Sequence, residues 1–289
     1  MARTLKIINY CINRFSFSLT MLRYLPMRIS AEISRYRKNH IHKLHGYYIE
    51  APDLLSLYIE NKDIFLKQIY GFTSLKPAPR IIDCGGFIGM STLYFRKKYP
   101  DAKIITFEPD PKIFQILKRN MERNHITNVE LIDSAVSKVD GYLMFDADGS
   151  DGGSLVNKNS TNINQIKVKS CRLSSYLSEP VDFLKLNIEG AEWDVFQEIE
   201  PVIHNVDQLV LEYHHFPGYE PQLHNILTLL HKNGFRYIIN HFDYETNPAV
   251  RTPLTISRDT TYFLIVYARR LDEKDDRIIQ KDYKTIQKS

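Results

Sequence analysis

Along the chain, the spacing of hydrophobic positions changes near residue 80. Before that point, apolar residues recur three and four positions apart, which is typical of one apolar stripe along an α-helix. Pro26 limits the first of these helical patterns, and a second lies around 54–72, before the rigid linker LKPAPR. The stripe of the first pattern consists of Leu5, Ile8, Ile12, Phe15, Leu19 and Leu22.

After residue 80, short apolar runs typical of strands alternate with helical patterns. Such alternation predicts an α/β fold with a doubly wound, mainly parallel sheet. Only a Pro-containing loop separates the last two strands, so we expect them to pair antiparallel at one edge. Strands are predicted at 81–84, 103–107, 128–136, 181–186, 208–213, 235–242 and 261–268. Helices are predicted from about residue 90, at 112–123, through Trp193 and Phe196, and from Leu223 to Asn233–Gly234.

The chain is thus expected to have three parts: a helical extension at 1–75, an α/β domain at 76–270 and a charged tail at 271–289. Of its 289 residues, 43% are hydrophobic and 25% charged, as in a globular protein. Cys11, Cys84 and Cys171 are odd in number and widely spaced, which suits neither a disulfide framework nor a zinc site.

The cysteine pattern therefore favours a reducing compartment, and we expect a cytoplasmic protein. No apolar stretch is long enough for a membrane span, and none has the form of a signal peptide. The net charge of +4 is concentrated in residues 1–45, which hold nine Lys or Arg and one acid, Glu32, so the remainder is net negative. We therefore expect no nucleic-acid partner. The first helix is expected to pack on the body or on a second copy, or to lie on an anionic membrane surface.

The first strand of the α/β domain ends in IIDCGGFIGMST, with Asp83 before Gly85, Gly86 and Gly89. Glycines permit a sharp turn, and the following helix N-terminus favours a carboxylate or phosphate. The spacing does not fit a dinucleotide fingerprint, because its third and sixth positions, counted from Gly85, are not glycine. An acid in the turn suits an ammonium group, so the loop is expected to bind an amino-acid moiety.

The next two strands add groups suited to a nucleoside. Glu108, after the second strand, is placed to accept hydrogen bonds from both hydroxyls of a ribose. Asp110–Pro111 reads as a helix N-cap followed by a first-turn proline, which fixes the direction of Glu108. Asp133 and Ser134 follow the third strand and suit an adenine edge. An amino acid, a ribose and an adenine together describe S-adenosylmethionine.

The stretches IIDCGGFIG, TFEPDP, FLKLNIEGAEWDVF and LVLEYHHF resemble the FkbM family of S-adenosylmethionine-dependent methyltransferases over about residues 61–242. The most specific run contains Lys185, Glu189, Gly190 and Glu192, where the family shows K-[ILV]-D-[VI]-E-G-x-E. Asn187 replaces the family aspartate, which keeps an acceptor oxygen but removes the charge. The resemblance implies a Rossmann-like class I methyltransferase fold, with S-adenosylmethionine as cofactor and a saccharide or other small molecule as acceptor.

The resemblance also implies roles for this run. Asn187 would lie near the methionine part of the cofactor, Glu189 would face the acceptor, and Gly190 would allow a close turn. Glu192 is either part of the site or an acid stabilised in a first helical turn; Trp193 and Phe196 are expected in the core. The predicted cofactor-binding residues are Asp83, Cys84, Gly85, Gly86, Gly89, Ser91, Glu108, Pro109, Asp133, Ser134 and Asn187. Cys84 itself is expected mainly to pack.

Methyl transfer to an alcohol needs a group that accepts the hydroxyl proton. Glu189 is the first candidate, followed by Glu212 and His214, which share one face of the strand ending in LVLEYHHF. His215 would point the other way.

The insertion DADGSDGGSLVNKNSTN invites comparison with a calcium loop that starts at Asp146. Asp151 stands at the sixth position, where glycine is required, and Asn157 at the twelfth, where a glutamate is expected. We therefore predict no metal site. The insertion is either a glycine-rich loop that closes over the acceptor or an ordinary hairpin.

The leading hypothesis is O-methylation of a saccharide or small molecule. An alternative is a non-catalytic module recruited to a membrane or partner by the basic arm. Methylation of nucleobase amines is disfavoured, because LNIEG stands where a [DN]-P-P-[YF] motif would follow the fourth strand. The glycine spacing disfavours a nicotinamide dehydrogenase.

Overall fold

The structure is a computed structural model that describes residues 24–33, 40–146, 154–155, 165–241, 257 and 260–271. The predicted helix at 5–22, most of the Gly- and Asp-rich insertion and the charged tail lie outside these ranges. None of the described helices is both long and apolar enough to span a membrane.

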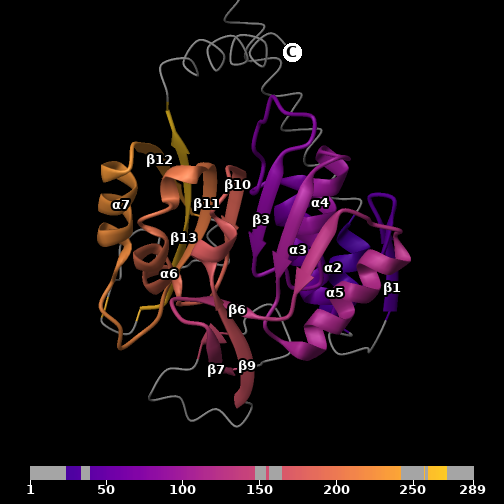
Figure 1. Cartoon of the computed structure of the whole chain (residues 1–289). Helices are drawn as coiled ribbons and strands as arrows, with labels where there is room; N and C mark the ends of the chain where they lie inside the picture. Colours follow the sequence, from indigo (N-terminus) through magenta and orange to yellow (C-terminus); the bar gives the residue numbers. More distant parts are fainter. Residues whose placement is uncertain are drawn as a thin grey trace, which may run out of the picture.

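The main sheet has seven strands in the order β12-β13-β11-β10-β3-β4-β5 (Figure 1). From β11 to β5 all neighbours are parallel, whereas β13 runs antiparallel to β11 and β12. The predicted doubly wound α/β fold is confirmed. The final two strands pair antiparallel as expected, although β13 inserts beside β11 and leaves β12 at the edge. The strands are β3 (Arg80–Cys84), β4 (Lys103–Phe107), β5 (Val129–Ile132), β10 (Val181–Leu186), β11 (Val206–His215), β12 (Phe235–Asn240) and β13 (Tyr262–Arg270).

Helices cover both faces of this sheet. Because successive strand residues point to opposite faces, Ile81 packs in the cluster that includes α4 and α5, whereas Ile82 packs in the one that includes α6 and α7. The predicted core positions Trp193 and Phe196 belong to the second cluster, with Trp193 partly buried and Phe196 fully buried. The helices are α4 (Met90–Lys98), α5 (Pro111–Arg123), α6 (Glu192–Ile199) and α7 (Leu223–Lys232), with 3-10 turns at Leu173–Tyr176 and Ile203–Asn205.

The segment before the sheet is more varied than its pattern predicts. Helix α2 (Leu25–Ile33) is followed by a hairpin of β1 (His40–Leu44) and β2 (Tyr47–Ala51). The predicted helix at 54–72 is α3 (Leu54–Glu60), continued by a π-helix, Asn61–Leu66. It ends early, where Gln68 adopts a positive φ of 54°.

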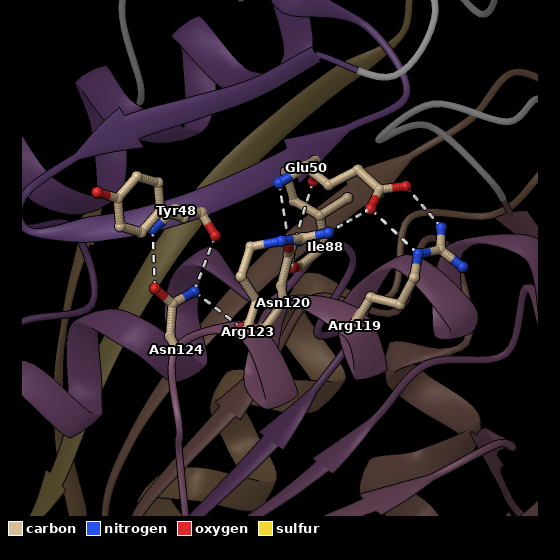
Figure 2. A network of polar contacts seen from close by, with 7 residues as sticks. All are labelled: Tyr48, Glu50, Ile88, Arg119, Asn120, Arg123 and Asn124. Carbon is tan, nitrogen blue, oxygen red and sulfur yellow. Dashed lines mark hydrogen bonds and ion pairs between the residues drawn. The ribbon is translucent and has the colours of Figure 1, made fainter.

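The hairpin is fastened to α5 by the polar network of Figure 2. Glu50 accepts hydrogen bonds from Arg119 at 2.6 and 3.1 Å and from Arg123 at 3.1 Å. Asn120 donates to the carbonyl oxygens of Glu50 and Ile88, both at 2.9 Å. The network therefore joins the hairpin, α5 and the loop after β3. Asn124 adds two bonds to the backbone of Tyr48.

The insertion forms a second sheet, in the order β6-β9-β7-β8, which lies below the main sheet in Figure 1. The strand predicted at 128–136 divides at Asp133–Ser134, and its second half is β6 in this small sheet. The alternating segment Gln165–Arg172 forms β9, which the sequence pattern did not identify. The strands are β6 (Ala135–Ser137), β7 (Gly141–Asp146), β8 (Ser154–Leu155) and β9.

Candidate active site

A cavity of about 430 Å³ lies at the carboxyl ends of the central strands. Gly85 after β3, Glu108 after β4, Asn187 after β10 and His214 in β11 all line it. The sheet order reverses direction between β3 and β10, so the cavity occupies the switch point where ligands bind in doubly wound folds.

The glycines of the loop after β3 are required by contacts within the protein. A Cβ on Gly85, whose φ is +86°, would lie 1.9 Å from the carbonyl oxygen of Asn187. A Cβ on Gly86 would lie 2.2 Å from a methyl group of Thr106. Gly85 lines the cavity, whereas Gly86 and Gly89 do not. Close packing against β4 and β10 therefore requires glycine at both positions, in addition to the sharp turn expected from the sequence.

Asp83 is fully buried, and β3 and β10 place it directly opposite Lys185. Its carboxylate lies 3.1 Å from Lys185 Nζ and accepts hydrogen bonds from Ser91 at 2.6 Å and Thr92 at 3.0 Å. Burial, the largest single effect, lowers the pKa of Lys185, but the charge of Asp83 and its hydrogen bond, together with the charge of Glu212, raise that pKa overall. Asp83 does not line the cavity, so the predicted contact with an ammonium group is corrected: this acid neutralises Lys185 and anchors α4. Cys84 is also fully buried and away from the cavity.

Lys185 links this buried polar cluster to Glu212, one of the candidate proton acceptors. Its ammonium group lies 2.5 Å from the carbonyl oxygen of Gly85 and 5.1 Å from the ring centre of Tyr70. The Tyr70 hydroxyl donates a hydrogen bond to Glu212, which is itself buried. Burial is the main cause of the raised pKa of Glu212.

Glu108 is held firmly in the cavity wall. Its two oxygens accept hydrogen bonds from the backbone N–H groups of Phe87 at 2.8 Å and Asp110 at 2.9 Å. Burial raises its pKa to about 7, while these two bonds act in the opposite direction. The predicted cap is confirmed, because Asp110 accepts from Lys112 N and Ile113 N before a first-turn proline.

Asn187 provides an unsatisfied hydrogen-bond acceptor in the same cavity as Glu108. Its backbone N–H donates to the carbonyl oxygen of Cys84 at 3.0 Å, but its buried Oδ1 has no hydrogen-bond partner among the described residues. A buried polar atom without a partner is costly, and in a cavity wall it marks where a ligand donor would lie.

The acceptor side of the cavity contains the imidazole of His214. Nδ1 lies 3.1 Å from Glu192 Oε1, and Nε2 lies 3.6 Å from Glu189 Oε1. Burial lowers the pKa of His214, but the charges of Glu189, Glu192 and Glu212 together raise it to about 10. Glu192 is buried at the start of α6 and also accepts from Gly190 N at 3.0 Å, so it fixes both the turn and the imidazole.

The structure thus brings most of the predicted residues to one cavity. All three proton-acceptor candidates, Glu189, Glu212 and His214, line it. So do the predicted cofactor-binding residues Gly85, Ser91, Glu108, Pro109, Ser134 and Asn187, whereas Asp83, Cys84, Gly86, Gly89 and Asp133 do not. The hydroxyl of Ser134 donates a hydrogen bond to the backbone carbonyl oxygen of Asp133 at 2.6 Å. His215 does not line the cavity, and its ring lies tilted against that of Tyr262, with ring centres 4.8 Å apart.

Several lining residues were missed by sequence reasoning. Glu60, Asp63 and Tyr70 come from the segment before the sheet, where the helical pattern alone gives no sign of a role in the site. Phe216 and Phe263 flank His214, with ring centres 6.1 and 5.9 Å from the imidazole. The predicted boundary between extension and α/β domain therefore separates residues that share one cavity.

Comparison with known proteins now places this site in a family. The model of the methyltransferase FkbM domain matches residues 83–237, which is more than half of the chain. The chain belongs to the FkbM methyltransferase family. S-adenosylmethionine is the cofactor of this family.

Individual relatives are more distant. "Methyltransferase 1" of Beauveria bassiana is 28% identical over 222 residues, covering 68% of this chain and 88% of the relative. "2-O-methyltransferase NoeI" of Sinorhizobium fredii is 27% identical over 168 residues, covering 51% of this chain and 68% of the relative. The solved structure of methyltransferase FkbM from Methylobacillus flagellatus KT superposes with a TM-score of 0.43 at 13% identity, covering 86% of this chain and 60% of that one.

Proposed function

We propose that this FkbM-family chain transfers a methyl group from S-adenosylmethionine to a hydroxyl group of a saccharide or other small molecule. The observation that carries the proposal is the His214 imidazole, held between Glu192 and Glu189 in the same cavity as Glu108 and Asn187. The printed name of the NoeI relative, a 2-O-methyltransferase, supports oxygen as the acceptor atom.

The residues of the cavity fit the cofactor. The unpartnered Oδ1 of Asn187 suits the ammonium group of an aminoacyl moiety, in place of the predicted Asp83. The carboxylate of Glu108, held by two backbone bonds, has lone pairs left for ribose hydroxyls, and Ser134 lies in the same wall. When bound, S-adenosylmethionine supplies a methyl group already activated on a sulfonium centre.

The task of the chain is then to orient the acceptor hydroxyl and take its proton. Glu192 accepts the hydrogen on Nδ1 of His214, which leaves the lone pair of neutral His214 on Nε2. We assign proton acceptance to Nε2, with Glu189 stabilising the imidazolium that results. Glu212, bonded to Tyr70, helps to set the charge around it.

The test is turnover with isotopically labelled S-adenosylmethionine and a panel of hydroxyl compounds, with the methyl position assigned by NMR. We expect methyl ethers, and a loss of at least about 100-fold in kcat in His214→Gln with unchanged affinity for S-adenosylhomocysteine. Methylation on nitrogen or carbon, or full activity of His214→Gln, would refute the assignment.

The domain organisation of the chain and its location in the cell are part of the same proposal. Residues 76–270 carry methyl transfer and residues 1–75 form an extension. In the cytoplasm, the helix predicted from the sequence at 5–22 contacts a membrane surface or a second copy of the chain. The concentration of positive charge in residues 1–45 supports this arrangement. Sedimentation of the full chain with anionic vesicles, compared with its oligomeric state alone, distinguishes the two contacts.

A further inference from the structure

One wall of the cavity comes from residues that lie outside the family-matched stretch 83–237. This extension wall consists of Ile59, Glu60, Asp63, Ile64, Ile69 and Tyr70. Most of it belongs to the end of α3 and the π-helix Asn61–Leu66. Short π-helical segments often occur at functional sites, since they redirect side chains within a helix. The extension wall stands on the acceptor side, because Tyr70 contacts Glu212 there.

The cavity lining contains more acidic than cationic side chains. Among the described residues, Lys185 and His214 are the only cationic side chains that line it. Lys185 is already paired with buried Asp83, and His214 is already held by Glu189 and Glu192. Neither cation is available to pair with a negatively charged acceptor.

Carboxylates face the same space from both sides. Glu60 and Asp63 line it from the extension wall, and Glu189 and Glu212 line it from the ends of the strands. Asp63 forms ion pairs with two lysines: Nζ of Lys67 lies 2.8 Å and Nζ of Lys62 lies 3.9 Å from its carboxylate oxygens. Neither lysine lines the cavity.

The electrostatic effects of these groups overlap. The charge of Asp63 contributes to the raised pKa of Glu212, and the charge of Glu60 contributes to the raised pKa of Tyr70, after burial as the main cause of each shift. The carboxylates of the two walls therefore act on one region. An anion placed there would be repelled in surroundings where water screens little.

We propose that the extension wall makes the acceptor site exclude anions, so that the acceptor is a neutral or cationic hydroxyl compound. This inference rests on the proposed function. Carboxylates accept hydrogen bonds from hydroxyl and ammonium groups, and the rings of Phe216 and Phe263 offer flat apolar surfaces to a ring-shaped acceptor. Phosphorylated and carboxylated compounds meet four acidic side chains of the lining, while both lining cations are already paired and the lysines beside Asp63 do not line the cavity.

The test uses matched acceptors that share one ring: methyl glucoside as the neutral member, glucosamine as the cationic member, and glucuronic acid and glucose 6-phosphate as the anionic members. Binding to the S-adenosylhomocysteine complex of the full chain is measured by saturation-transfer NMR, beside methyl transfer. We expect the anionic members to bind at least about 10-fold more weakly than their neutral partner. Because binding is read without turnover, failed transfer would refute the proposed function while leaving this inference decided by the binding series.

A charge-reversal variant locates the selectivity. Glu60→Lys should reduce the discrimination against the anionic members by about 10-fold, and Glu60→Gln should reduce it less. Glu122→Lys is the matched control, because it makes the same charge change at an exposed position of α5. Affinity for S-adenosylhomocysteine should be the same in all three variants.

Two results would overturn the inference. The first is anionic members that bind as well as the neutral one to the unaltered chain. The second is a change of selectivity in Glu122→Lys equal to that in Glu60→Lys, since the effect would then come from net charge rather than from the extension wall.

Discussion

Nδ1 of His214 lies 3.1 Å from Oε1 of Glu192, although the two residues are 22 positions apart and belong to a strand and a helix. The same carboxylate oxygen accepts the backbone N–H of Gly190. Glu192 therefore sets the orientation of the imidazole together with the turn that carries Glu189. The FkbM-type run LNIEGAE supplies both acids, and β11 supplies the histidine.

The pH dependence of turnover should report the charge state of His214. Its pKa of about 10 means that the imidazole is protonated at neutral pH, and proton acceptance requires the neutral form. We expect kcat/KM to rise with pH up to about 10. Burial by itself opposes the shift, and Glu189 is the largest contribution that raises the pKa. Glu189→Gln should therefore lower the pKa of His214 by about one unit, measured by NMR titration of the imidazole.

The control for this titration is Glu122→Gln, the same substitution on the exposed face of α5. Its His214 titration should match that of the unaltered chain. An unchanged pKa in Glu189→Gln would show that the 3.6 Å contact has no electrostatic weight.

Cofactor affinity and turnover should separate between two acids of the cavity. Glu108→Ala removes a carboxylate fixed by Phe87 N and Asp110 N, so affinity for S-adenosylhomocysteine should fall by about 10- to 100-fold. Glu189→Ala should leave that affinity nearly intact and lower kcat at a pH where His214 is neutral, because the imidazolium that forms on proton acceptance loses its stabilising charge. Calorimetry on both variants provides the measurement, and equal losses of affinity would contradict the division of roles.

The sheet and most of the site follow from sequence because the apolar runs are separate and each ends in polar residues. Strands that are parallel present those ends at one edge, so Glu108, Asn187 and His214 could be expected together. The Asp83–Lys185 pair could not, since it depends on which strands are neighbours. The sequence predicts a ligand contact for Asp83 because its partner lies 102 residues farther along the chain, in β10.

The hairpin and the extension wall could not be predicted from the sequence for a different reason. The β1–β2 turn is His45–Gly46, with φ values of 53° and 95°, and lacks the Asn-Gly or Asp-Gly sequence that identifies such turns. The contact of Tyr70 with Glu212 spans 142 residues, and no local pattern encodes it. Its position follows from packing of the π-helical segment against α4.

Two glycines with similar backbone conformations should respond differently to alanine. Gly85→Ala adds a Cβ that would lie 1.9 Å from a backbone oxygen, in addition to the strain of a positive φ, so we expect a loss of at least about 3 kcal/mol. Gly46→Ala has a φ of +95° but nothing within 4 Å of its Cβ, so the strain alone should cost about 1–2 kcal/mol. Urea unfolding of both variants tests this, and equal losses would show that the loop relaxes freely around Gly85.

The free energy of unfolding at acid pH should depend on Glu50, which joins the hairpin to α5. Hydrogen bonding from Arg119 is the main cause of its lowered pKa, against the opposing effect of burial. A carboxyl group with a lower pKa in the folded state stabilises the fold above its unfolded pKa and loses this contribution as the pH falls through the folded value. Glu50→Gln should cost about 1–2 kcal/mol at pH 7, since Arg119 is partly exposed and its interaction is screened.

The same substitution should make stability less dependent on pH below about 4.5, the usual range of the group. Urea unfolding at several pH values measures both effects, with Glu122→Gln as the control on the exposed side of the same helix. If Glu50→Gln lost stability equally at pH 7 and at pH 3, the network of Figure 2 would act through packing rather than through the charge of Glu50.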